Sequence, residues 1–183
     1  MPIRTAFYEA VMARVIEKVT EVKHFDLYFN QYFQEGENGE NEDSFPLTAV
    51  FFEYNPAQWD NVGKNKQVTA QTFSLHVINS VIQDVSNRET PTIRNKGHAH
   101  MLIIDKIVAC LQGFNGTDFG AISRTSDKPY HMAKDDRIVD IIDFKSRLTD
   151  RAAMPVMQHL DKKDVVLVIT PDLDGDANEV EDD

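Results

Sequence analysis

Apolar residues near the start of the chain recur at spacings of three and four positions. The residues with this spacing are Phe7, Val11, Val15 and Val22, and Tyr8, Met12, Ile16 and Val19 stand beside them. An α-helix completes a turn every ~3.6 residues, so this spacing gathers the apolar side chains on one wide face. The pattern predicts a helix from about Thr5 to Val22 that packs on a core.

The spacing changes from helical periodicity to alternation at Lys23, which marks a boundary between two elements. The apolar positions of the alternating segment are Phe25, Leu27, Phe29 and Phe33. Alternation of this kind is typical of a strand with one buried face. The segment 46–54, PLTAVFFEY, is apolar on both faces of the pleat, so we expect this strand to lie inside a sheet.

A connection rich in Asn, Pro and Gly follows at 55–66 and leads into a third strand at 67–78. The alternation gives this strand one face that we expect to point to the core and one that we expect to point outward. The core-facing residues are Phe73, Leu75 and Val77, and the outward-facing residues are Thr72, Ser74 and His76.

Helical spacing returns at 98–112, and Gly113 stands where helices commonly end in a left-handed residue. The apolar stripe of this predicted helix consists of Met101, Ile104, Val108 and Leu111. The segment before it, 79–97, leaves its structure open. The Thr90–Pro91 pair is a possible helix start, whereas Gly97 is expected to interrupt any element that begins there.

Three further segments have the composition of strands: 121–125, 136–144 and 165–170. Asp140 and Asp143 interrupt the second of them, which is why we predict that it lies at an edge of the sheet. The strands cluster in the sequence instead of alternating with helices. The predicted fold class is therefore α+β, with a mainly antiparallel sheet of about four to six strands flanked by two main helices.

We expect one domain over 1–171 and an acidic, disordered tail over 172–183, because the tail has too little apolar surface to order itself. The chain of 183 residues has a formal net charge of -11, and part of the excess acid lies in this tail and in 35–44. A field of that sign repels phosphates, so we expect no sequence-specific contact with nucleic acid. The sequence shows neither a secretory signal nor the ~18 apolar residues of a membrane helix, which favours a soluble protein inside the cell that binds no membrane.

The candidate metal ligands are His98, His100 and His131, the last with Asp135 and Asp136 nearby. On a helix, residues two apart point ~200° away from each other, so His98 and His100 are poorly placed to share a metal. A closed zinc site needs four ligands, and the chain has no pair of cysteines. We predict exposed or capping histidines and no metal site.

The C-terminal segment DLDGDANEVEDD places Asp172, Asp174 and Asp176 like the first ligands of a calcium loop. That loop needs glycine where this sequence has Ala177 and glutamate where it has Asp183, with a helix on each side. We therefore predict a disordered tail instead of a calcium site.

Cys110 stands in the apolar run IVACLQG, which favours a buried thiol over a reactive nucleophile. The sequence contains no nucleophile elbow, phosphate-binding glycine loop or paired-carboxylate motif. We predict no catalytic residue, no cofactor and no enzyme. Trp59 and Tyr54 have two open interpretations: they anchor a partner, or they fold back over the end of the sheet.

The segments FFEYNPAQWDNVGKNKQVTAQTFSLHVI and MLIIDKIVACLQGFNGTDFGAISR carry a family resemblance. In the order of its predicted elements and in its pattern of apolar and polar residues, the chain resembles the tail-terminator or tail-completion proteins of long-tailed phages and prophages, including minor tail protein U-like chains. In that family a strand, a loop and an outward-polar strand precede a helix that ends in a Leu-x-Gly turn. This chain is longer, through 35–44, 79–97 and its acidic tail.

The resemblance implies a structural subunit of a homo-oligomeric ring, usually of six, that caps the tail tube. Its implied partners are copies of itself, the tail tube protein and the head–tail connector protein. Its implied location is the cytoplasm of a bacterial host and then the virion tail. A closed ring hides sheet edges against neighbouring subunits, and the edges expected to do so are 25–33 and 136–144.

Two other classes of function stay open from the residues alone. One is a small metal-dependent hydrolase that uses His98, His100 or His131. The other is a monomeric module that binds a partner protein.

Overall fold

The computed structural model describes residues 2–30, 45–63, 66–80, 88, 90–131 and 137–151. The helices and strands are α1 Ile3–Lys18, β1 His24–Leu27, β2 Ala49–Tyr54, β3 Asp60–Asn61, β4 Gln67–Ser80, α2 Pro91–Leu111, β5 Ser123–His131 and β6 Arg137–Asp150. The predicted strand at 165–170, the acidic segment 35–44 and the tail 172–183 lie outside the described residues.

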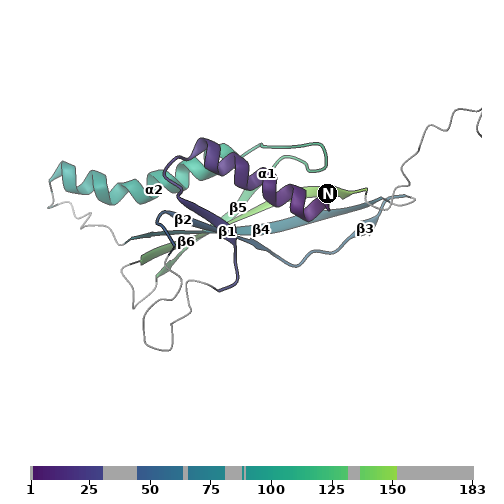
Figure 1. Cartoon of the computed structure of the whole chain (residues 1–183), viewed down its shortest axis with the longest axis horizontal. Helices are drawn as coiled ribbons and strands as arrows, with labels where there is room; N and C mark the ends of the chain where they lie inside the picture. Colours follow the sequence, from purple (N-terminus) through teal and green to yellow (C-terminus); the bar gives the residue numbers. More distant parts are fainter. Residues whose placement is uncertain are drawn as a thin grey trace, which may run out of the picture.

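The strands form one sheet in the order β1-β2-β4-β6-β5, and β3 pairs with the start of β4 (Figure 1). Strand β1 runs parallel to β2, and every other pairing is antiparallel. The two long central strands pair along their whole length, from Gln67 opposite Asp150 to Ser80 opposite Arg137. The prediction of an α+β fold with a mainly antiparallel sheet is confirmed.

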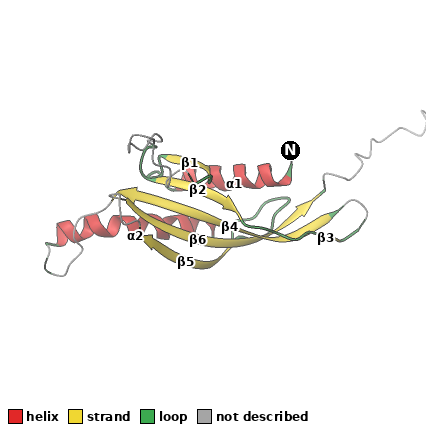
Figure 2. Ribbon diagram, turned by 90° about the horizontal axis from the view of Figure 1, so that it is seen from below, coloured by secondary structure: helices red, strands yellow, loops and turns green. Residues whose placement is uncertain are grey.

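Both helices cover the same face of the sheet, so the described part of the chain forms two layers (Figure 1). Figure 2 shows α1 beside β1 and β2, and α2 beside β6 and β5. The two helices lie next to each other, and the Nε of Arg14 in α1 donates a hydrogen bond to the carbonyl of Cys110 in α2 at 3.2 Å. Within the described residues, each helix therefore has one flank against the other helix and one flank on the side away from it.

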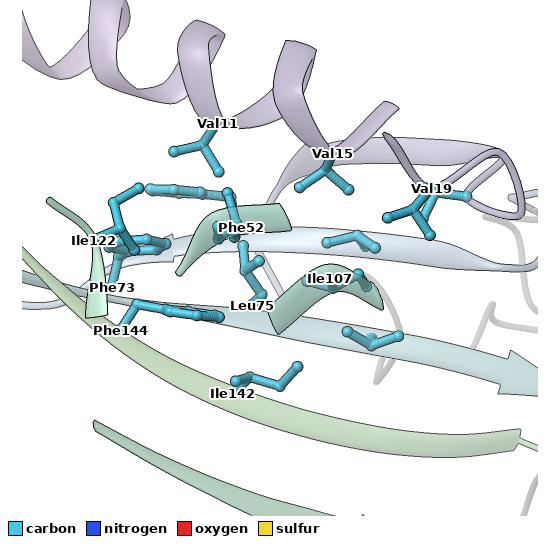
Figure 3. Packing of buried hydrophobic residues seen from close by; sticks show 14 of the residues in the cluster. Val11, Val15, Val19, Phe52, Phe73, Leu75, Ile107, Ile122, Ile142 and Phe144 are labelled. Atoms are coloured by element: carbon cyan, nitrogen blue, oxygen red, sulfur yellow. The ribbon is translucent and has the colours of Figure 1, made fainter. Parts of the chain in front are cut away.

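The main core lies between the helices and the sheet, as Figure 3 shows. Every second residue of β4 points into this core because side chains alternate along a strand. From α1 the core takes the valines that the helical spacing predicted, and from α2 it takes Ile107 and Leu111. The largest fully buried side chains here include Phe7, Phe52, Phe73, Leu75, Ile122, Ile142 and Phe144.

A second, smaller cluster lies on the opposite face of the sheet and consists of Ala49, Phe51, Ile78 and Val139. The burial of this face differs from the solvent-exposed face that the sequence predicted for β4. Ser74 and His76 do point away from the main core, but they are only 4% and 3% exposed. The central strands are thus buried on both faces, whereas alternation in the sequence predicted one face in solvent.

Helix α2 begins at Pro91, at the start signal of the Thr90–Pro91 pair, and not at His98. It continues through Gly97, so the expectation that this glycine interrupts the segment was wrong. A single glycine inside a helix costs only about 1 kcal/mol, which packing of the rest of the helix offsets. Gly113 follows the helix with φ of 78°, and this confirms the predicted left-handed residue.

The prediction that 136–144 forms an edge strand was wrong, because β6 lies between β4 and β5. Aspartates are tolerated in an inner strand here because both have hydrogen-bonding partners. Asp140 contacts His100 of α2, and Asp143 accepts hydrogen bonds from Ser74 and Ser126. The edge is β5, which is longer than the strand predicted at 121–125.

Candidate functional site

Two of the histidines singled out as metal ligands, His98 and His100, point to different sides of α2. His98 is exposed and His100 is buried, as expected for two residues that point to different sides of one helix. His131 lies in β5, and Asp135 and Asp136 lie outside the described residues. Within the part of the chain that the structure describes, no three side chains of His, Cys, Asp or Glu are grouped to hold a metal ion.

His100 is neither exposed nor a helix cap, which corrects the prediction for this residue. Its Nε2 is hydrogen-bonded to the carboxylate of Asp140 in β6, and its Nδ1 lies 2.7 Å from Nδ2 of Asn79 in β4. The amide oxygen of Asn79 accepts a hydrogen bond from the hydroxyl of Thr48. These four side chains, Asp140, His100, Asn79 and Thr48, form one buried polar chain that ties α2 to the sheet.

This polar chain resembles a catalytic relay only in composition. Both imidazole nitrogens of His100 are used by protein partners, and the chain ends in a threonine that donates its proton to an amide. Cys110 donates its own hydrogen bond to the carbonyl of Ile107 at 3.2 Å, and burial raises the pKa of its thiol. A raised pKa lowers the thiolate fraction, which disfavours Cys110 as a nucleophile. The side chain is half-buried, whereas the sequence predicted a buried thiol.

The other face of the sheet holds a second polar group, which the sequence interpretation missed. The ring of His76 stacks on Tyr28 of the segment after β1, with centroids 4.2 Å apart, and its Nε2 lies 2.9 Å from Oε2 of Glu53 in β2. Burial lowers the pKa of His76, although Glu53 and Asp143 act in the opposite direction. A histidine at an alternating polar position gives no signal of such burial, because its surroundings come from other strands.

Asp143 lies beside this group and bridges three strands. Oγ of Ser74 in β4 and Oγ of Ser126 in β5 each donate a hydrogen bond of 2.6 Å to its carboxylate. Burial by itself would raise the pKa of Asp143, but these hydrogen bonds and the charge of Lys128 outweigh it and lower the pKa. Asp143 is therefore an ionised structural acceptor, and not an acid poised to give up a proton.

We expect the protein to lose stability in mild acid, with His76 responsible for part of the loss. The pKa of His76 lies below its ordinary value of 6.5 in the folded chain. Below the ordinary pKa, unfolded chains therefore bind a proton at this histidine while the folded chain keeps the imidazole neutral. The resulting loss of stability is absent above the ordinary pKa. It grows as the pH falls toward the folded-state pKa, by no more than about 1.4 kcal/mol per pH unit.

Urea unfolding between about pH 7.5 and pH 5 checks this linkage. Replacing His76→Gln should flatten the pH dependence of the free energy of unfolding. The matched control is His98→Gln, which removes an exposed histidine from α2. Identical slopes for the wild type and His76→Gln would contradict the assignment.

Among the described residues, β1 and β5 are the two end strands of the sheet. In the described part of the chain, β5 pairs only with β6, and residues 124–129 are exposed. This edge carries a bulge between Arg124 and Ser126, followed by Lys128 and Pro129. A bulge, a lysine and a proline are devices that keep an edge from pairing with arbitrary strands. Any partner of β5 must therefore fit a specific surface.

An apolar flank lies along α1 at the β1 side of the molecule. Tyr8 contacts the ring of Phe25 in β1, with centroids 5.9 Å apart, and Met12 and Ile16 follow at four-residue spacing on the same side of the helix. Arg14, which faces α2, marks the opposite flank. Ile16 is 48% exposed. We call Tyr8, Met12 and Ile16 the α1 flank.

A second apolar flank lies along α2 at the β5 side. Lys106 faces α1, since its Nζ forms an ion pair with Glu21 after the end of that helix. Ile104 and Val108, two positions to either side of Lys106, point to the other side of the helix, and Met101 follows the same stripe. Met101 is 59% exposed. We call Met101, Ile104 and Val108 the α2 flank.

Trp59 and Tyr54 are both partly buried against the main core, which favours the interpretation that they cover the end of the sheet. Burial raises the pKa of Tyr54, and its hydroxyl donates a hydrogen bond to the carbonyl of Arg4. Of the two described helices, neither is both long and apolar enough to cross a bilayer.

No family model matches the sequence, and no curated protein matches it. Among solved structures, the chain is similar to a chain from the virion of a native gene transfer agent particle. The TM-score is 0.49 at 14% sequence identity, and the alignment covers 81% of this chain and 98% of that chain. A likeness of this size carries no inference about function.

Proposed function

We propose that this protein is a structural subunit of a phage or prophage tail, which forms a closed homo-oligomeric ring of the tail-terminator type. The proposed ring caps the tail tube and joins it to the head connector. The observation that carries the proposal is that β1 and β5 are the two end strands of the sheet in the described residues, and that each lies beside an apolar helix flank. Such a subunit has two different surfaces with which to contact two neighbours.

The chemistry of the described polar groups also favours a structural role. The buried imidazoles of His76 and His100, and the carboxylates of Asp140 and Asp143, are each engaged by neighbouring strands or by α2. His100 and Asp140 tie α2 to the sheet, and His76 and Asp143 connect strands on the opposite face of the sheet. The resemblance in the segments that form β2, β4 and α2 supplies the tail-terminator part of the proposal.

Mass measurement of the purified full chain tests the proposal. We expect light scattering after size exclusion to give an integer multiple of the chain mass that persists on dilution, and negative-stain images to show closed rings. A monomer at every accessible concentration would overturn the ring. Metal analysis of the same sample separates the alternative class, because a stoichiometric bound metal would favour a metal-dependent hydrolase.

A further inference from the structure

We infer that Asn115 is a site of spontaneous deamidation, and that the folded turn around it slows the reaction until the turn opens. Asn115 and Gly116 lie in the connection between α2 and β5, and both residues are exposed. Asparagine is one of the residues whose side chain degrades most readily. The reaction needs only water, so it is independent of the proposed ring.

The chemistry uses the side chain of Asn115 and the main chain of Gly116. Solvent base removes the proton from the backbone nitrogen of Gly116, and this nitrogen attacks the side-chain carbonyl carbon of Asn115. A carbon–nitrogen bond forms, the bond to Nδ2 breaks, and ammonia leaves. Water then opens the resulting succinimide at either of its carbonyl groups, which gives aspartate or isoaspartate. No oxidant or reductant takes part.

The packing of the turn requires glycine directly after Asn115. A β-carbon at position 116 would overlap the ring of Phe119, which lies over the main chain at this point. That ring is fixed in turn by Phe7 of α1, with centroids 5.1 Å apart. Glycine has no β-carbon to hinder its own nitrogen during the attack. The contact that selects glycine therefore also creates a labile dipeptide.

Both reacting groups are engaged elsewhere in the folded turn. Nδ2 of Asn115 donates a hydrogen bond to the carbonyl of Gly113 at 3.3 Å, and the backbone N–H of Gly116 donates to the carbonyl of Phe119 at 3.1 Å. The side chain must leave Gly113 and the nitrogen must leave Phe119 before they can meet. The turn therefore has to open before the reaction starts.

The base of the turn is held by main-chain hydrogen bonds at a buried residue. The N–H of Gly113 donates to the carbonyl of Ile122, and the N–H of Ile122 donates to the carbonyl of Phe114, each at 2.8 Å. Ile122 is fully buried in the main core. Opening of the turn is thus tied to the packing of the core, and the folded chain should protect Asn115.

The product does not fit the turn as the asparagine does. A carboxylate at position 115 would face the carbonyl of Gly113, which now accepts a hydrogen bond from Nδ2. It would also add negative charge just after the end of α2, where the last helix carbonyls already carry partial negative charge. Isoaspartate lengthens the main chain by one carbon and so displaces Gly116 from Phe119.

Peptide mapping by mass spectrometry tests the site in the full chain. The protein is kept in mildly alkaline buffer, folded or unfolded in urea, and conversion of amide to acid is followed at each asparagine. We expect Asn115 to react in urea, and about tenfold or more slowly in the folded chain. The map must separate Asn115 from Asn38, which also precedes a glycine and lies outside the described residues.

The matched control is Asn61, which is exposed like Asn115 but precedes Val62. Because a branched side chain crowds the attacking nitrogen, Asn61 should react about tenfold or more slowly than Asn115 in urea. Gly116→Ala should slow the reaction at Asn115 in urea in the same way, and there the folding of this variant does not matter.

Each outcome decides one part of the inference. An unfolded chain in which Asn115 reacts no faster than Asn61 overturns the site. Equal rates at Asn115 in the folded and the unfolded chain leave the site standing and overturn its protection by the turn. Faster reaction in urea that Gly116→Ala does not slow overturns the role of Gly116.

Discussion

Replacing Phe7→Ala should lower the free energy of unfolding by about 3–5 kcal/mol, as expected for a large core side chain cut to a methyl group. Phe7 is fully buried, and its ring meets Phe73 and Phe119 edge-on at centroid distances of 5.2 and 5.1 Å. These partners come from β4 and from the segment before β5. Removing the ring leaves a cavity bordered by separate elements, which cannot close without moving α1.

Urea unfolding at neutral pH measures this loss. The matched control is Phe29→Ala, which removes the same atoms from a side chain that is 67% exposed. Its effect should stay below about 1 kcal/mol. A loss at Phe7 no greater than the loss at Phe29 would show that α1 does not pack as described.

A second comparison on α1 separates a core position from an exposed one. Phe7 and Ile16 stand on one helix, but the first points into the core and the second lies on the outer flank. We therefore expect Phe7→Ala to lower the free energy of unfolding, and Ile16→Glu to leave it nearly unchanged.

Replacing Asn79→Ala should lower the free energy of unfolding by about 2–4 kcal/mol, because it leaves two buried polar groups without partners. The hydroxyl of Thr48 loses its acceptor, and Nδ1 of His100 loses its donor. All three residues are less than a tenth exposed, so solvent cannot easily replace the amide. The loss therefore exceeds that of an ordinary hydrogen bond.

The control for this substitution is Asn61→Ala in β3. Oδ1 of Asn61 accepts a hydrogen bond from Nε2 of Gln67 at 2.9 Å, but both residues are exposed. We expect an effect within about 0.5 kcal/mol in the same unfolding experiment. Equal losses at the two asparagines would mean that the chain from Asp140 to Thr48 does not hold α2 on the sheet.

If both results hold, two separate sets of contacts fix α2 on the sheet. The main core anchors the C-terminal half of this helix through Ile107 and Leu111, and the polar chain anchors it at His100.

The sequence pattern predicted one of the two end strands of the described sheet and misplaced the other. Alternation at 25–33 predicted a strand at one edge, and in the described sheet the end strand β1 covers His24–Leu27. The second edge was misplaced on β6, because Asp140 and Asp143 resembled residues that blunt an exposed strand. In the folded chain these carboxylates meet His100, Ser74 and Ser126, residues that the sequence keeps far away.

The amino-acid sequence by itself determined the α+β class, the first helix, the inner strand at 46–54 and the left-handed turn at Gly113, because periodicity and glycine geometry are local properties. Only the tertiary structure decided that His76 and His100 are buried, since burial depends on strands distant in the chain. It also decided that Ile16 and Met101 stand outside the core. In spacing they match their buried neighbours, and only the packing of two helices on one face of the sheet leaves them on outer flanks.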